Sequence, residues 1–208
     1  MGVTATLPGL SSGVEVLLDD RARGAKVTYE PAFIDPATAD KMLVDLVRAL
    51  PLEAESPIMF GRPVTVRRRT CGIGEKGLRY RYSGIERVAH PWPTGFAPLL
   101  DRLEAATGSR FNFALCNLYP DGDVGLGWHS DDEHDLARDA PIASLSLGAE
   151  RDFMVRLGRA GRACLTVSLA SGSLLVMGGS LQRFYQHRVP PRRRCEAPRL
   201  NLTFRVMR

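Results

Sequence analysis

The sequence predicts an α+β protein whose core is a double-stranded β-helix, also called a jelly roll. Three observations favour this fold. Two amphipathic helical patterns lie in the first half of the chain, short strand patterns fill the second half, and Gly or Pro separates those strands. Helices followed by closely spaced strands are typical of a sheet folded on itself, and a barrel of this kind has an interior that can hold a small ligand.

Length and composition fit one globular domain. The chain has 208 residues, 44% of them hydrophobic and 25% charged, with a formal net charge of +5. We expect residues 1–25 to form a flexible N-terminal segment and residues 26–208 to form a single domain. Residues 14–20 and 25–34 have the pattern of short extended segments.

The beginning of the chain and the cysteines indicate the compartment. The first residues lack the basic segment and apolar core of a secretory signal, and no apolar run is long enough for a membrane span. The four cysteines are scattered, without a C-x-x-C pair. We therefore expect a reduced, intracellular protein, cytoplasmic or nuclear, that is a monomer without membrane contact or an obligate protein partner.

Two helices are predicted before the strands. The first begins at Asp35-Pro36, an N-cap followed by a proline suited to the first helical position, and Pro51 ends it. Its apolar residues recur on one face, at Met42, Leu43, Leu46, Val47 and Leu50. The second helix runs from about Gly95 to Thr107, after which Gly108 can adopt the left-handed conformation that ends a helix.

Strand patterns occupy the rest of the chain. They lie at residues 111–119, 141–148, 151–158, 163–170, 173–177, 184–189 and 199–206. Alternation along a strand sends successive side chains to opposite faces. In the first of these strands, Asn117 and Tyr119 share a face with apolar residues. Polar groups at the end of an apolar face are typical of a pocket with an apolar floor and a polar opening.

The last strand has one apolar face and one polar face. Its polar face carries Arg199, Asn201, Thr203 and Arg205. Two interpretations are open. This face could be solvated, as in many sheets, or it could line a barrel, where two arginines are tolerated if they bind an anion such as a dicarboxylate.

The stretch GWHSDDEH, residues 127–134, contains a candidate metal site. His129 and Asp131 are one residue apart, so in an extended segment both point to the same side, and His187 lies in a later strand. His-x-Asp with a distant His is the facial triad of non-haem Fe(II) oxygenases. The pattern differs from the H-E-x-x-H of zinc proteases. A solvated acidic turn is the alternative.

The motifs together resemble one family. From about Phe60 to Arg205, the sequence resembles the AlkB family of Fe(II)- and 2-oxoglutarate-dependent nucleic-acid demethylases, and most closely the subgroup that repairs double-stranded DNA. The motifs that carry this resemblance are FNFALCNLYPDG, HSDDE, PIASLSLGAERDF, GSLLVM, YQHRVP and APRLNLTFR. The resemblance implies that His129, Asp131 and His187 bind Fe(II).

The resemblance also implies a cosubstrate site for 2-oxoglutarate, with O2 as the second cosubstrate. Arg199 and Tyr119 would hold the distal carboxylate of 2-oxoglutarate. Arg205 and Asn117 would steady the end that chelates the metal, and Asn201 belongs to the same site. The implied reaction is oxidative demethylation of N1-methyladenine and N3-methylcytosine in DNA, with release of formaldehyde.

The methyl groups in question lie on the Watson–Crick edge, so the base must be flipped out of the duplex. The resemblance implies a nucleotide-recognition hairpin region at about residues 55–90. There Tyr82 would stack on the base opposite the ring of His129, with Tyr80 and Ser83 near its polar edge. The alternative for these tyrosines is an aromatic strand packed in the core.

Two acids follow the metal motif directly. Methylation at these nitrogens leaves the base cationic near neutral pH, and a carboxylate beside it would favour the cation. The family places its base-reading acids at this point, so Asp132 and Glu133 are expected to contact the substrate, with Glu133 ahead of Asp132. A solvated turn is again the alternative.

The remaining expected contacts are with the DNA strand itself. Phe60 is the candidate for an apolar wedge that fills the gap left by a flipped base, with Met59 second and Arg62 in the same hairpin. A basic cluster is expected to hold phosphates, at Arg192, Arg193 and Arg194. Core packing of the apolar pair and a solvated basic face are the alternatives.

Two other functions stay open. The same chemistry could act on RNA or on another modified base, or the chain could be a nucleic-acid-binding module with a non-catalytic metal site. The partner expected first is DNA, double-stranded and also single-stranded.

Overall fold

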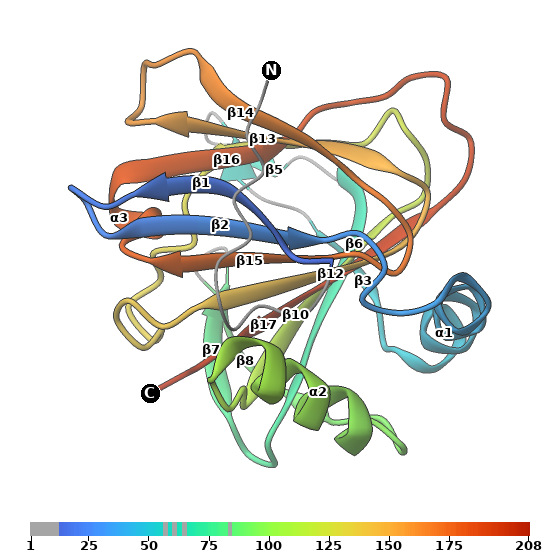
Figure 1. Ribbon diagram of the computed structural model, residues 1–208. Helices are drawn as coiled ribbons and strands as arrows, with labels where there is room; N and C mark the ends of the chain where they lie inside the picture. Colours follow the sequence, from blue (N-terminus) through green and yellow to red (C-terminus); the bar gives the residue numbers. More distant parts are fainter. Residues whose placement is uncertain (1–12, 56–57, 60–61, 64–65, 83–84) are drawn as a thin grey trace.

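The computed structural model describes residues 13–55, 58–59, 62–63, 66–82 and 85–208. In this part of the chain, two β-sheets pack face to face, and two long helices lie on the outer side of the larger one (Figure 1). This is the jelly-roll arrangement predicted from the order of helices and strands.

The larger sheet has nine strands, most of them antiparallel. Its order is β1 (Glu15–Asp20), β2 (Ala25–Glu30), β15 (Leu174–Gly179), β12 (Ile142–Gly148), β17 (Arg199–Arg205), β10 (Phe113–Tyr119), β6 (Val66–Gly74) and β3 (Glu53–Glu55), with β9 (His90–Pro91) parallel to β6. The central strands β10, β12 and β17 are buried along almost their whole length. They form the rigid floor on which the polar cavity is built.

The smaller sheet has four strands and covers the floor. Its order is β11 (Leu126–His129), β16 (Tyr185–Val189), β13 (Arg151–Leu157) and β14 (Ala163–Leu169). Strand β11 is therefore an edge strand. Two hairpins precede these elements in the chain, β4 (Ile58–Met59) with β5 (Arg62–Pro63) and β7 (Arg79–Tyr82) with β8 (Ile85–Val88).

The helices form where capping and periodicity predicted them. Helix α1 (Pro36–Ala49) begins after Asp35, whose Oδ1 accepts a hydrogen bond from the backbone N–H of Thr38 at 3.0 Å. Helix α2 (Ala97–Thr107) ends at Gly108, which has φ of 70°. A short helix, α3 (Leu181–Phe184), joins β15 to β16.

The apolar and the polar face of the last strand, β17, have different surroundings. Leu200, Leu202 and Phe204 point toward the helices and pack with residues such as Leu46 and Leu103. The opposite face of β17 looks at the smaller sheet. The structure therefore agrees with the second interpretation of this polar face, in which it lines the interior between the two sheets.

The expectation of a flexible segment over residues 1–25 is wrong for residues 15–20. Strand β1 pairs with β2, and its Leu17 and Leu18 pack against the core between the sheets. The hydroxyl of Tyr185 donates a hydrogen bond to Asp20 Oδ2 at 2.7 Å. Apolar burial and edge pairing hold this segment in place. Among the described residues, no helix has the length and apolar character needed to cross a membrane.

Candidate active site

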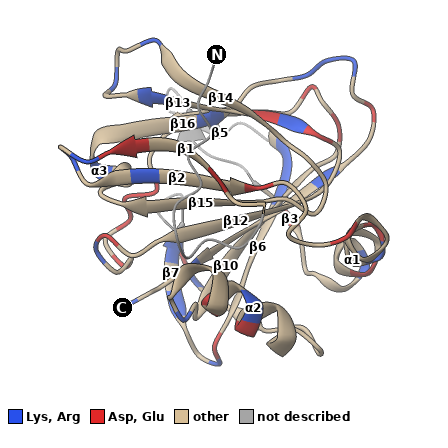
Figure 2. Ribbon diagram, viewed as in Figure 1, with Lys and Arg blue, Asp and Glu red and all other residues tan. Residues whose placement is uncertain are grey.

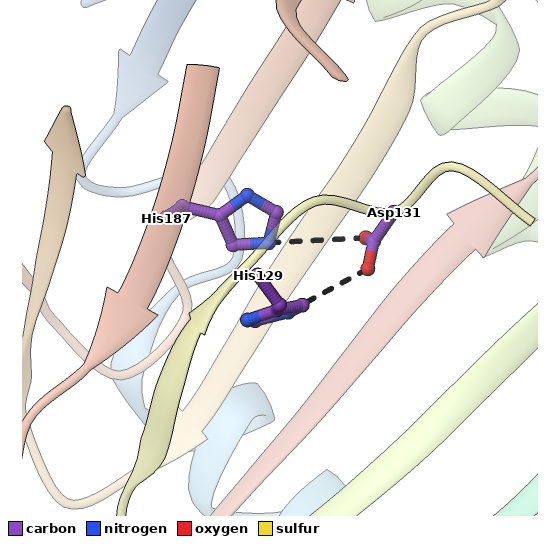
Figure 3. Close-up of side chains that lie close together, drawn as sticks. All are labelled: His129, Asp131 and His187. Atoms are coloured by element: carbon purple, nitrogen blue, oxygen red, sulfur yellow. Dashed lines mark ion pairs between the residues drawn. The ribbon is translucent and has the colours of Figure 1, made fainter. Parts of the chain in front are cut away.

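The three candidate metal ligands meet between the two sheets. His129 ends the edge strand β11 and is paired directly with His187 of β16, and Asp131 follows two residues later. Figure 3 shows both imidazoles turned toward the carboxylate. Nε2 of His129 lies 3.6 Å from Asp131 Oδ1, and Nε2 of His187 lies 4.0 Å from Oδ2. One ligand atom from each residue lies within 4.8 Å of the others, close enough for one ion.

The surroundings of two of these ligands prepare them for a cation. Burial lowers the pKa of His187 to about 3, against the opposing effect of the Asp131 carboxylate, so this imidazole is neutral at physiological pH. Burial alone would raise the pKa of Asp131, but the Arg205 guanidinium, 3.1 Å from its Oδ2, holds that pKa below its usual value. The site therefore presents a neutral imidazole and a carboxylate, the forms that bind metals.

The third ligand is oriented by the backbone. Nδ1 of His129 lies 2.9 Å from the carbonyl oxygen of Gly127, which can only accept, so Nδ1 must carry the proton. Nε2 of His129 then carries the lone pair that can bind a metal, and this atom faces Asp131. The ring of Phe153 stacks on His187 with centroids 5.2 Å apart and fixes the plane of that imidazole.

Asp131 is held by a segment that motif reasoning did not identify. Its backbone N–H donates to Oε1 of Gln182 at 3.0 Å, and the hydroxyl of Ser130 donates to the carbonyl of Tyr185 at 2.9 Å. Helix α3 and the start of β16 therefore set the position of the metal-binding loop. No sequence motif marks Gln182, because it acts on a backbone group 51 residues away.

A cavity of about 270 Å³ adjoins the metal ligands. Its lining brings together all five residues expected at the cosubstrate site, Asn117, Tyr119, Arg199, Asn201 and Arg205. Those residues come from β10 and β17 of the larger sheet, whereas His129 and His187 come from the smaller one. Each sheet thus supplies one half of the site.

The far end of the cavity suits an anion. Arg199 is 1% exposed, and its Nη2 donates to Ser146 Oγ at 2.9 Å, whereas Nε and Nη1 have no hydrogen-bond partner among the described residues. Burial lowers its pKa to about 10, which leaves the guanidinium charged at neutral pH. Its Cζ lies 5.4 Å from the ring centroid of Tyr119. A buried cation with two unused donors fits a carboxylate.

The other cavity residues have different surroundings. The Oδ1 atom of Asn117 is buried without a partner in the described structure, so it can accept from a ligand. Asn201 uses its amide N–H groups on Ser144 Oγ and the carbonyl of Leu145, both at 2.9 Å. Asn201 therefore shapes the wall of the cavity. Residues that suit a dicarboxylate and a metal ion lie side by side.

The two acids after the metal motif have different environments. Glu133 is partly buried, and its Oε1 accepts from Arg205 Nη1 at 3.1 Å. It also lines a second cavity of about 550 Å³, with Tyr80 and Arg81 of β7. Asp132 is exposed. Glu133 therefore lies between the cosubstrate cavity and this outer cavity.

The aromatic residues of the recognition region are described only in part. Tyr80 is 5% exposed and packs against Phe113 with ring centroids 4.6 Å apart, so most of its ring belongs to the core, although it also lines the outer cavity. The side chain of Tyr82 and the whole of Ser83 lie outside the described residues. The structure therefore places one of the three expected base contacts.

The expected DNA contacts are likewise described in part. Met59 and Arg62 are paired across the β4–β5 hairpin, but their side chains, and Phe60, lie outside the described residues. The basic cluster is exposed in the loop after β16, at Arg192, Arg193 and Arg194. Arg192 pairs with Glu150 at 3.1 Å.

Arg151 organises the loops around that cluster. It is 1% exposed at the start of β13, and its guanidinium donates to the carbonyls of Asp121, Val124 and Pro190 at 2.8 to 3.2 Å. The sequence contained a signal for this position, because Arg151 has the same strand parity as the buried Phe153. Strand alternation alone predicts that the Arg151 side chain is buried.

Comparisons with known proteins agree with this geometry. Residues 26–205 match the family model of the 2OG-Fe(II) oxygenase superfamily. DNA oxidative demethylase ALKBH2 of Mus musculus is 38% identical over 195 residues, 89% of this chain and 81% of that protein. Alpha-ketoglutarate-dependent dioxygenase alkB homolog 3 of Homo sapiens is 36% identical over 192 residues, 88% of this chain and 66% of that protein.

A solved structure gives the same fold. OsALKBH1 superposes with a TM-score of 0.63 at 18% identity, covering 86% of this chain and 96% of that one. The family match over most of the sequence, together with the two relatives, shows that this chain belongs to the 2OG-Fe(II) oxygenase superfamily and, within it, to the AlkB family.

Proposed function

We propose that this protein repairs alkylated DNA by oxidative demethylation of N1-methyladenine and N3-methylcytosine, using Fe(II), 2-oxoglutarate and O2. The observation that carries the proposal is that the His129–Asp131–His187 cluster and Arg199 line one cavity, and that Nε and Nη1 of the buried Arg199 guanidinium have no hydrogen-bond partner among the described residues. The metal ligands and Arg199 line the same cavity of about 270 Å³, in which one small dicarboxylate would contact both.

The residues divide into two tasks. His129, Asp131 and His187 would hold the metal, and Arg199 would bind the distal carboxylate of 2-oxoglutarate. When bound, Fe(II) and 2-oxoglutarate supply an oxidant made from O2 that hydroxylates an N-methyl group. Arg205 keeps Asp131 ionised, and the buried walls of the cavity exclude water from the reacting atoms.

DNA is proposed as the substrate on two grounds. The ALKBH2 relative is named a DNA oxidative demethylase. In addition, Glu133 separates the cosubstrate cavity from the outer cavity, where its carboxylate would favour a base made cationic by methylation. The base would have to leave the helix stack to reach this position.

An assay of the pure protein tests the proposal. Fe(II), 2-oxoglutarate and an oligonucleotide with 1-methyladenine or 3-methylcytosine should yield formaldehyde and succinate in equal amounts. Asp131→Ala should abolish both products and keep DNA binding, because it removes a metal ligand. Loss of the methyl group without 2-oxoglutarate would contradict the proposal.

The same assay separates the other candidates. Single-stranded DNA, duplex DNA and RNA with the same lesion should be compared in competition. Faster turnover on RNA would move the substrate to RNA, and tight nucleic-acid binding without succinate would favour a binding module. The proposal predicts that DNA is processed faster than RNA of the same sequence.

A further inference from the structure

The outer face of the smaller sheet carries a stack of one aromatic ring and two guanidinium groups. Both guanidinium groups lie over the ring of Trp128, with Arg156 Cζ 4.5 Å and Arg188 Cζ 4.7 Å from its centroid. Arg156 is anchored by Oε1 of Gln186, which accepts from its Nε at 3.2 Å and from its Nη2 at 2.6 Å. Arg188 contacts the sulfur of Met154. Both guanidinium groups are thus held by a second contact besides the ring.

The two arginines of the stack have no carboxylate partner among the described residues. Within the described part of the chain, neither Arg156 nor Arg188 forms an ion pair. Asp152 is exposed on the same face of β13, but the structure places no ion pair between it and the stack. Two adjacent positive charges, partly exposed and held in a fixed orientation, fit an anionic partner better than solvent alone.

The position of the stack links it to the metal site. Trp128 directly precedes His129 in β11, and Arg188 directly follows His187 in β16. Because strand residues alternate between faces, the stack and the metal ligands lie on opposite sides of the same two strands. Since β11 is an edge strand, a chain that leaves the site can pass around one strand and reach the stack.

The basic surface continues beyond the stack. Strand β16 runs directly into the loop that carries the exposed Arg193 and Arg194. Figure 2 shows basic residues on β13, on β16 and in the loop that follows β16. The backbone of this loop is hydrogen-bonded to Gly122, whose carbonyl oxygen accepts a hydrogen bond from the Arg192 N–H at 2.7 Å. The stack and the loop are therefore joined by one strand, and both carry positive charge.

We propose that the Arg156–Trp128–Arg188 stack binds the phosphate backbone of the nucleic-acid strand that flanks the base in the active site. This inference rests on the proposed function, because the partner is the substrate strand. Guanidinium N–H groups bind phosphate oxygens, and guanidinium planes stack on unpaired bases. The guanidinium groups of Arg156 and Arg188 lie over Trp128, so the ring orients the two cations.

Salt-dependent binding tests the role of the two cations. Fluorescence anisotropy should be measured with unmodified single-stranded DNA of 3 and 15 nucleotides between 50 and 200 mM salt, about the range in which phosphate contacts dominate. For Arg156→Gln/Arg188→Gln, the slope of log K against log salt should fall by about 1.4 with the longer strand, roughly 0.7 for each lost phosphate contact. The 3-nucleotide strand should be unaffected, since it is too short to pass around β11.

Two further variants control for charge and folding. Arg48→Gln removes one positive charge from the exposed side of α1 and should leave the slope unchanged, whereas each single variant, Arg156→Gln or Arg188→Gln, should lower it by roughly 0.7. Arg156→Lys/Arg188→Lys keeps the charge and should restore most of the slope. Circular dichroism checks that each variant is folded. A wild-type slope in the Gln double variant would overturn the inference, and so would the same loss in Arg48→Gln.

Trp128 provides a second readout. The chain has two tryptophans, and Trp92 packs in the core against Phe96 and Phe204, so Trp92→Phe leaves Trp128 as the reporter. Its emission should change when the 15-nucleotide strand binds, and an acidic peptide at equal charge should not compete. If the emission of Trp128 does not change, or if the peptide displaces the DNA, the result would count against a nucleic-acid site. If wild-type protein releases formaldehyde while these readouts fail, the proposed function stands and this inference falls.

Discussion

Arg199 carries a positive charge in the interior, where an isolated ion is strongly disfavoured. We expect Arg199→Met to weaken 2-oxoglutarate binding roughly 10- to 150-fold, which corresponds to losing a charge-assisted hydrogen bond of about 1.5–3 kcal/mol. Calorimetric titration in the presence of Mn(II) measures the change. Arg48→Met makes the same replacement on the surface and should bind 2-oxoglutarate like the wild type. Equal affinities for the two variants would mean that Arg199 does not hold the carboxylate.

Gln182 acts on the metal site through the backbone of a ligand. Gln182→Leu removes the acceptor for the Asp131 N–H, so the metal-binding loop loses one of its anchors. Outer partners of this kind are typically worth about 10- to 100-fold in metal affinity, and we expect Mn(II) binding to weaken by that factor. Gln182→Glu keeps an acceptor oxygen and should bind Mn(II) more tightly than the leucine variant. If both variants bind Mn(II) like the wild type, Gln182 has no positioning role.

The sequence predicted those site residues that obey a local rule. Strand alternation placed Arg199 and Arg205 on one face, and the His-x-Asp spacing placed His129 and Asp131 on one side of a short segment. Gln182 follows no such rule, since its contact joins a side chain to a distant backbone group. Residues that act through non-local backbone contacts need the three-dimensional structure.

At the scale of elements, helix α1 depends on its N-terminal cap. Asp35→Ala removes the side-chain acceptor of the Thr38 N–H and leaves a donor of the first turn unsatisfied. The free energy of unfolding should fall by about 1 kcal/mol, measured by urea denaturation. Asp35→Ser can form the same hydrogen bond and should lose much less. Equal losses would show that the cap is unimportant to this helix.

Elements long enough to show periodicity were predictable, and the short ones were not. Helices α1 and α2 have caps and an apolar face, and β17 alternates over seven residues. Strands β4, β5 and β9 have two residues each, too few to contain a pattern. Residues 14–20 have an extended pattern, but that pattern does not show that Leu17 and Leu18 pack against distant strands, and the expectation of a flexible end therefore included β1.

At the scale of the whole molecule, stability should depend on the ligands. Metal and 2-oxoglutarate bind the folded chain only, so at about 100 times the dissociation constant each ligand adds about 2.7 kcal/mol. For a domain of this length, we expect 2-oxoglutarate to raise Tm by roughly 5–11 °C when Mn(II) is present. Differential scanning fluorimetry measures the shift. Arg199→Met should shift less at the same ligand concentration, and an equal shift would place the cosubstrate elsewhere.

The division of the site between two sheets has a dynamic consequence. His129 and His187 belong to the smaller sheet, and Arg199 and Asn117 belong to the larger one. A small molecule that touches both sets adds a cross-link between layers that the Arg205–Asp131 ion pair already connects at this site. Amide hydrogens of β16 and β17 should then exchange with solvent as one cooperative unit in the loaded protein and as two separate units without ligands, which hydrogen-exchange mass spectrometry resolves. The cosubstrate would thus be a removable part of the fold as well as a reactant.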